Sequence, residues 1–284
     1  MIAVITGRTR RLYSRPPNPP YVLNSDCIQA QGLVAFWPMG EPSARSYYNY
    51  ARRGLDLLTQ TGTMTLGPGP GGSDLAPGNT GATGNYLSVS RAIVTAVPFT
   101  FANWFLAAST TAFMNLIIVS DTVGNAYFNY GLATLTAGTV HAGTNDNNAE
   151  TTTTYSVNTW NHACGVYNGV ASRSAFLNGG GKATNTTSST PSGLNLTELG
   201  GFINTYGMLN GRMTHACIWD RALSDTEVWL LYEPKTRWDL YYQPGRKTYS
   251  IGAPAAGGRT TRNTLASPLG VHLGRGLWTH GGSG

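Results

Sequence analysis

Short apolar runs, many of them alternating with polar residues, recur along the chain between Gly32 and Asp220. Glycine, asparagine, serine and threonine separate these runs. Side chains of a strand alternate between the two faces of a sheet, so short alternating runs with regular turns predict an antiparallel sandwich or barrel. The predicted strands are 32–39, 85–89, 99–105, 115–119, 127–132, 139–143, 162–167, 173–177, 196–200 and 212–220.

One helix is predicted after the last strand. Ser224 and Glu227 have the spacing of a capping box, in which each side chain bonds the backbone amide of the other residue. Apolar residues follow at helical spacing, and Pro234 ends the helix. We therefore expect a short helix that packs against the sandwich.

A Gly/Pro tract interrupts the strand pattern between Gly67 and Gly72. Strand patterning resumes soon after it, so we interpret the tract as a surface loop inside the sandwich and not as a domain boundary.

The two ends of the chain lack the strand pattern. Proline residues between Arg15 and Tyr21 exclude a helix or a central strand, so residues 1–31 are predicted to form an extended arm. Residues 234–284 combine an aromatic segment, 238–242, with a Gly/Ala-rich stretch. They contain too few apolar residues to form a core of their own. The prediction is thus a sandwich at 32–233 between arms at 1–31 and 234–284.

Charge is scarce and unevenly placed. Only 11% of the residues are charged, against roughly 25% in an average soluble domain. Residues 32–233 hold eight basic and eleven acidic residues, a net charge of −3, whereas the two ends hold eleven basic and two acidic residues, a net charge of +9. Basic ends on a near-neutral body favour arms that dock on a partner, although solvated charge on disordered ends is the open alternative.

Four arginines within eight positions of the N-terminal arm can bind an acidic surface or phosphate. The chain shows no nucleic-acid-binding fold, so we expect an acidic protein partner and no nucleic acid. The residues expected to contact that partner are Arg8, Arg10, Arg11, Arg15, Pro19, Tyr21, Trp238, Tyr241 and Tyr242.

The cysteines and the N-terminal sequence indicate in which cellular compartment the protein is made. Cys27, Cys164 and Cys217 are odd in number and fit no disulfide framework. The first apolar run is too short for the core of a signal peptide, and its charges follow it. No apolar stretch approaches the ~20 residues of a membrane span. We expect a protein that is made in the cytosol, is not exported by the usual signal and does not contact a membrane.

Six sequence landmarks, in the right order, resemble the laminin-G-like, concanavalin-A-like jelly-roll superfamily. This resemblance covers about 32–232 and implies an all-β, antiparallel jelly-roll sandwich with one short C-terminal helix. The landmarks are 32–38, 85–89, 98–105, 160–163, 176–179 and the closing segments 209–213 and 218–224.

The whole layout resembles proteins of tailed phages, in which such domains serve as capsid decoration, head fibres or tail parts. The resemblance implies a non-enzymatic virion structural protein, assembled in the host cytoplasm, with the sandwich displayed and the arms docked on neighbours. Its expected partners are other virion proteins such as the major capsid protein, and we expect a homo-oligomer.

Glycoside hydrolysis is the enzymatic alternative, because glucanases share this fold. Retaining enzymes of this kind need two carboxyl groups about 5–5.5 Å apart, and on a strand they would recur at even spacing. The acidic residues Asp121, Asp146, Glu150 and Glu198 are instead scattered and form no such cluster. We therefore expect no catalytic residues.

Two groups of residues could bind a metal. Asp146, Asn148 and Glu150 could offer oxygen ligands to calcium, but an Asn-rich turn explains the same residues, and calcium wants six to eight oxygens. Two His-x-Cys units, 162–164 and 215–217, could form a zinc site if their strands were neighbours. Ordinary burial of cysteine is the interpretation that we favour, so no metal or other cofactor is expected.

A carbohydrate-binding, lectin-like module on a cell or particle surface is the alternative function. Tyrosines in predicted loops can stack on sugar rings, although such amphipathic rings also anchor loops. The candidates for contact with host glycans are Tyr47, Tyr48, Tyr50, Tyr155 and Tyr206.

Overall fold

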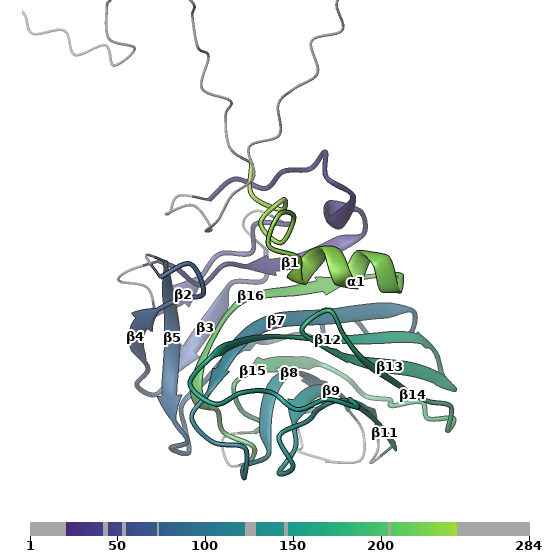
Figure 1. Cartoon of the computed structure of the whole chain (residues 1–284). Coiled ribbons are helices and arrows are strands. Elements are labelled where there is room, and N and C mark those ends of the chain that lie inside the picture. The colour runs from purple at the N-terminus through teal and green to yellow at the C-terminus, as the bar shows by residue number, and fades with distance from the viewer. Residues whose placement is uncertain are drawn as a thin grey trace, which may run out of the picture. The chain divides into compact units, whose positions relative to one another are not determined.

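The computed structural model of the chain describes residues 21–41, 45–52, 55–72, 74–122, 129–144, 147–203 and 206–242. Two eight-stranded antiparallel sheets lie face to face and form a sandwich with one short α-helix (Figure 1). The prediction of an all-β jelly-roll sandwich is thereby confirmed.

The first sheet has the order β14-β13-β12-β7-β16-β5-β4, and β1 also pairs with β16. Its strands are β1 (Leu33–Trp37), β4 (Thr65–Pro68), β5 (Leu75–Thr80), β7 (Phe99–Ala107), β12 (Trp160–Gly169), β13 (Ser172–Leu177), β14 (Gly180–Asn185) and β16 (Asn210–Trp219).

The second sheet has the order β11-β10-β9-β8-β15-β6-β3-β2. Its strands are β2 (Ser46–Tyr47), β3 (Leu58–Thr61), β6 (Tyr86–Val89), β8 (Met114–Ser120), β9 (Tyr130–Thr134), β10 (Val140–Thr144), β11 (Asn147–Glu150) and β15 (Leu196–Leu199).

The main core lies between the sheets and follows from strand alternation. On β7, Phe99, Phe101 and Phe105 point into this core, whereas Ala102 and Trp104 lie on the outer face. Phe99 also stacks on Tyr167 of β12, with ring centroids 4.4 Å apart.

The Gly/Pro tract is partly a strand, which corrects the prediction of a loop from 67 to 72. Gly67 and Pro68 end β4, which pairs with β5 at the edge of the first sheet. An edge strand can hold a proline because one row of its backbone groups faces away from the sheet and needs no amide donor.

The predicted helix is confirmed as α1 (Asp225–Tyr232). The Ser224 side chain accepts from the Glu227 amide, and the Glu227 carboxylate accepts from the Ser224 amide at 2.9 Å. The helix lies on the outer side of the first sheet (Figure 1) and buries Val228 and Leu231 there.

Both described ends of the chain also cover this outer face. Leu23 pairs with Tyr241 in an antiparallel bridge, and the Tyr242 amide donates to the Val22 carbonyl at 2.7 Å. Tyr21, Trp238 and Tyr241 are at most 3% exposed and belong to one apolar cluster with the sheet. The rings predicted to contact a partner are thus buried against their own sandwich.

Of the remaining predicted partner contacts, Tyr242 is 48% exposed. Arg8, Arg10, Arg11, Arg15 and Pro19 lie outside the described residues. The sandwich therefore extends past the predicted boundaries at 31 and 234, to at least residues 21 and 242. Within the described residues, no helix has the length and apolar character that a membrane crossing requires.

We predict that Trp238→Ala lowers the free energy of unfolding by about 3–5 kcal/mol, because it empties a buried site between the C-terminal segment and the sheet. Urea unfolding of the purified chain measures it. Trp229→Ala is the matched control, since Trp229 is 46% exposed on α1, and should change stability by less than about 1 kcal/mol. Equal stability of Trp238→Ala and the wild type would show that this segment does not support the sandwich.

Candidate functional site

Three of the five candidate tyrosines are not free to bind a ligand. Tyr47 is fully buried in the core, and Tyr155 is 4% exposed with its hydroxyl donating to the Ser109 carbonyl at 2.9 Å. The half-buried Tyr50 donates to the carboxylate of Glu41. These rings anchor loops, so the structure removes them as candidates for sugar contact.

Tyr48 and Tyr206 are exposed, with 59% and 56% of their surface accessible. Tyr48 follows the end of β2, which pairs with the start of β3. Tyr206 lies between β15 and β16, and β15 ends beside the start of β6, which pairs with the end of β3. The two tyrosines therefore lie at opposite ends of the sandwich.

The loop that carries Tyr206 is tightly held. Phe202 and Tyr206 exchange two backbone hydrogen bonds of 2.9 and 3.1 Å, and the Asn115 amide donates to the Gly207 carbonyl at 2.8 Å. The Tyr206 ring lies 5.1 Å from the half-buried ring of Phe113. Tyr206 is thus presented on a supported aromatic pair, with part of its surface in solvent.

A buried carboxylate supports the same loop from below. Glu198 on β15 is 1% exposed, and both of its oxygens accept from the Ile203 amide at 3.1–3.2 Å. Ile203 has a φ of 46°, a strained angle for a β-branched residue, so the carboxylate holds a costly backbone conformation. Burial raises the pKa of Glu198 to about 7, and the bond from Ile203 opposes this rise. Glu198 is a positioning residue that sequence reasoning missed.

Hydrogen bonds join the loops at this end of the sandwich into one surface. Gly81 donates to Leu209, Ala108 to Asn210, and Tyr155 to Gly138, with N···O distances of 2.8–2.9 Å. Loop 62–64 joins 81–85 through a bond from the Thr63 amide to the Asn85 side chain. We call this surface the Tyr206 end and define it as residues 62–64, 81–85, 108–113, 135–139, 151–159, 200–203 and 206–209.

Exposed side chains of the Tyr206 end are mainly hydroxyls and amides. Such groups both donate and accept hydrogen bonds, and together with an exposed aromatic ring they match the hydroxyls and the apolar faces of a sugar. The exposed hydroxyl and amide residues are Thr63, Thr83, Thr111, Thr136, Thr152, Thr153, Thr154, Ser156, Asn158 and Thr159.

Glu198 and Glu150 do not form a hydrolytic pair. Glu198 lies on β15 and Glu150 on β11, and β8, β9 and β10 separate these two strands. Four inter-strand steps span roughly 19 Å, whereas a retaining glycosidase needs about 5–5.5 Å. Asp121 directly follows β8, one strand across from Glu198 and about 10 Å farther along than the residue that pairs with it, which also exceeds that spacing.

The candidate metal ligands do not come together in the described part of the chain, which holds no group of three or more His, Cys, Asp or Glu that could bind a metal. Asp146 lies outside the described residues. Glu150 accepts a 2.7 Å bond from the Thr139 hydroxyl. The two His-x-Cys strands, β12 and β16, are separated by β7, so the zinc alternative fails.

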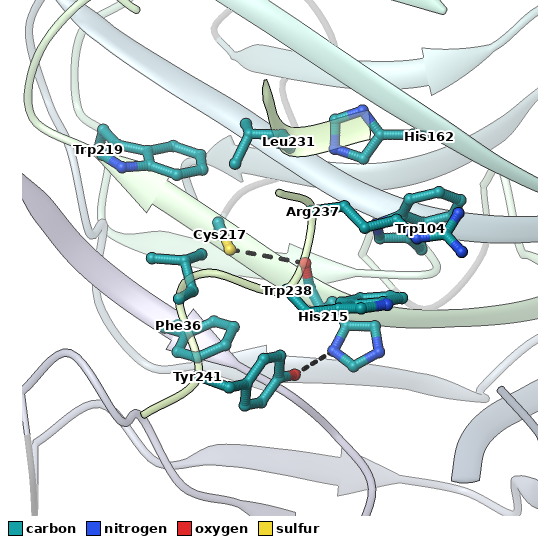
Figure 2. A pocket seen from close by; sticks show the side chains of 12 residues that line it. Phe36, Trp104, His162, His215, Cys217, Trp219, Leu231, Arg237, Trp238 and Tyr241 are labelled. Carbon is teal, nitrogen blue, oxygen red and sulfur yellow. Dashed lines mark hydrogen bonds between the residues drawn. The ribbon is translucent and has the colours of Figure 1, made fainter. Parts of the chain in front are cut away.

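The three cysteines and two histidines instead belong to the outer face of the first sheet. His162, His215 and Cys217 line a cavity of about 20 Å³ that the C-terminal segment closes with Arg237 and Trp238 (Figure 2). Such a volume holds a single water molecule, so this cavity is a packing gap and not a ligand site.

A buried chain of hydrogen bonds next to this cavity holds the C-terminal segment in place. His215 lies between the Asp74 carboxylate, 3.3 Å from Nε2, and the Tyr241 hydroxyl at Nδ1. Figure 2 shows the contact with Tyr241. Burial lowers the pKa of His215, although Asp74 opposes this shift. A neutral His215 donates to Asp74 and accepts from Tyr241, so all three groups are satisfied.

Comparison with protein families places the fold. A family model described as the concanavalin A-like lectin/glucanases superfamily matches residues 80–229. The chain belongs to this superfamily. No curated protein sequence matches it.

Among solved structures, this superfamily member is similar to domain 4 of AbnA, an extracellular GH43 arabinanase from Geobacillus stearothermophilus, in complex with arabinotriose. The TM-score is 0.57 at 16% identity, over 71% of this chain and 98% of that domain.

It is also similar to Trypanosoma rangeli sialidase in complex with sialic acid, with a TM-score of 0.54 at 14% identity, over 71% of this chain and 33% of that one. The binding domain of Paraclostridial Mosquitocidal Protein 1 gives 0.51 at 15% identity, over 72% and 52%. At these identities the similarity shows the fold alone.

We predict that Glu198→Gln changes how stability depends on pH. The pKa of Glu198 is raised on folding, so its ionisation costs the folded state stability as pH rises from about 4.5 to about 7. Glutamine is neutral throughout and still offers an acceptor to Ile203. Relative to the wild type, the variant should therefore gain ~1–3 kcal/mol between pH 4 and pH 8.

Chemical denaturation at a series of pH values measures this difference. Glu150→Gln controls for the removal of a carboxylate as such. A stability difference between Glu198→Gln and the wild type that is constant over pH would contradict the prediction.

Proposed function

We propose that this chain is a non-enzymatic carbohydrate-binding module that takes sugars at the Tyr206 end. One observation carries the proposal: a solvent-exposed tyrosine ring, held by backbone hydrogen bonds to Phe202 and by contact with the Phe113 ring, lies among exposed hydroxyls and amides on a surface assembled from several loops. Rigid aromatic rings give contact area at a low entropic cost, and the polar groups around them fix orientation.

Membership of a superfamily that includes lectins supports a binding role. The similar arabinanase domain was solved with an arabinotriose ligand, and a similar sialidase with sialic acid. The separation of Glu198 from Glu150 supports the absence of hydrolysis by these two residues, since it exceeds the spacing of a catalytic pair.

Attachment to a particle through the chain ends is a second candidate. The pairing of Val22 with Tyr242 supports it, because both predicted basic arms start from one place on the sandwich. A virion location, a capsid-protein partner and a homo-oligomeric state stay predictions from the sequence, and the similar proteins do not point to them.

We predict that the full chain binds a set of glycans on an array and that Tyr206→Ala weakens binding about tenfold or more, a loss of ~1.4 kcal/mol, because the stacking surface is removed. Isothermal titration with the best array ligand measures the affinity.

Tyr48→Ala is the matched control, since Tyr48 is as exposed as Tyr206 but lies outside the Tyr206 end. It should bind as the wild type does. Absence of binding to every glycan on the array would contradict the proposed function. Equal weakening of binding by Tyr206→Ala and Tyr48→Ala would show that the site is not at the Tyr206 end.

A further inference from the structure

We infer that the Tyr206 end selects uncharged glycans and excludes sialylated, uronic and sulfated ones. This inference rests on the proposed function and adds the chemical class of the ligand. It follows from the distribution of charged residues, which occur elsewhere on the sandwich but not in the loops of the Tyr206 end.

The loops of the Tyr206 end contain no charged residue type. Their sequences hold no Asp, Glu, Lys, Arg or His. Hydroxyl and amide side chains provide the polarity instead. An 11% charged chain leaves some stretches neutral by chance, but here six loops distant in sequence and joined by hydrogen bonds are all neutral.

The charged side chains on neighbouring strands include Glu150 of β11, Lys182 of β14 and Arg212 of β16. Glu150 accepts from Thr139 at 2.7 Å, and Lys182 bonds both oxygens of Asp225 at 2.8 and 2.9 Å. The half-buried side chain of Arg212 lies against the backbone of Gly67. None of these cations belongs to the loops that surround Tyr206.

Charged residues occur instead in connections at the opposite end of the sandwich. Arg91 bonds both carboxylate oxygens of Asp56 there, and Arg221 pairs with Glu227 at 2.6 Å. Charge is therefore segregated within the domain, and the Tyr206 end is its neutral part.

This segregation determines which sugar can bind. A glycan carboxylate or sulfate placed on the Tyr206 end would lose water without gaining a cation from these loops, which costs free energy. The sugar hydroxyls of an uncharged glycan can exchange donors and acceptors with threonine and asparagine side chains at no such cost. The same absence of charge makes binding insensitive to salt, because only interactions between charges are screened.

Any test must distinguish binding by the basic arms from binding at the Tyr206 end. Residues 1–20 carry four arginines and 243–284 carry five basic residues, with no acidic residue in either segment. Anionic glycans held by such segments would bind with strong salt dependence and without regard to Tyr206.

The experiment uses the full chain and the matched pair lactose and 3′-sialyllactose, together with arabinotriose and the best neutral and best anionic ligands from the array. Affinities are measured by titration at ionic strengths of about 0.01 and 1 M, at which the Debye length falls from roughly 30 to 3 Å. Wild type, Tyr206→Ala, Tyr206→Phe and Tyr48→Ala are compared.

We expect neutral ligands to bind with an affinity that changes less than about twofold with salt, to lose about tenfold or more in Tyr206→Ala, and to be retained in Tyr206→Phe and Tyr48→Ala. An anionic ligand that binds Tyr206→Ala as well as wild type, and only at low salt, is held elsewhere and supports the inference when neutral binding is present.

Tyr206-dependent binding that favours the sialylated member of the pair, or that weakens at high salt, would overturn the inference while leaving the proposed function intact. Absence of binding to every glycan would overturn both, so the two failures are distinguishable.

Discussion

The structure depends on a first sheet that is apolar on both faces. Antiparallel sheets commonly leave one face in water, but β7 directs Phe101 into the core between the sheets and Trp104 to the opposite side. That opposite side must be covered, and α1 together with the first and last described segments of the chain covers it. The position of these two segments is therefore a consequence of packing.

Covering that face brings distant parts of the sequence together. Trp238 packs on Trp104, with ring centroids 5.7 Å apart, and the Arg237 guanidinium lies over both rings. The Trp219 indole donates to the Gln29 carbonyl at 2.6 Å. With one face of the first sheet used for these contacts, the loops at the Tyr206 end are left as a neutral, hydroxyl-rich surface for a ligand.

The candidate site combines local and long-range determinants. Tyr206 is exposed because it lies in the connection between β15 and β16. Its position nevertheless depends on Glu198, which supports the loop through the Ile203 amide, and on the ring of Phe113 beside it. Glu198 has no sequence signal that separates it from a scattered surface carboxylate. Only its burial beneath Ile203, which also raises its pKa, distinguishes it.

The sequence by itself determined the strand pattern, the sandwich and the capped helix, because alternation and the Ser224–Glu227 spacing are local properties of the chain. Short strands such as β4 and β14 escaped prediction, since their sequences hold too few apolar residues to show an alternating pattern. Only the tertiary structure decided which tyrosines are exposed and that Trp238 is core. Burial depends on neighbours far along the chain, and six neutral loops become one surface only when the strands are paired.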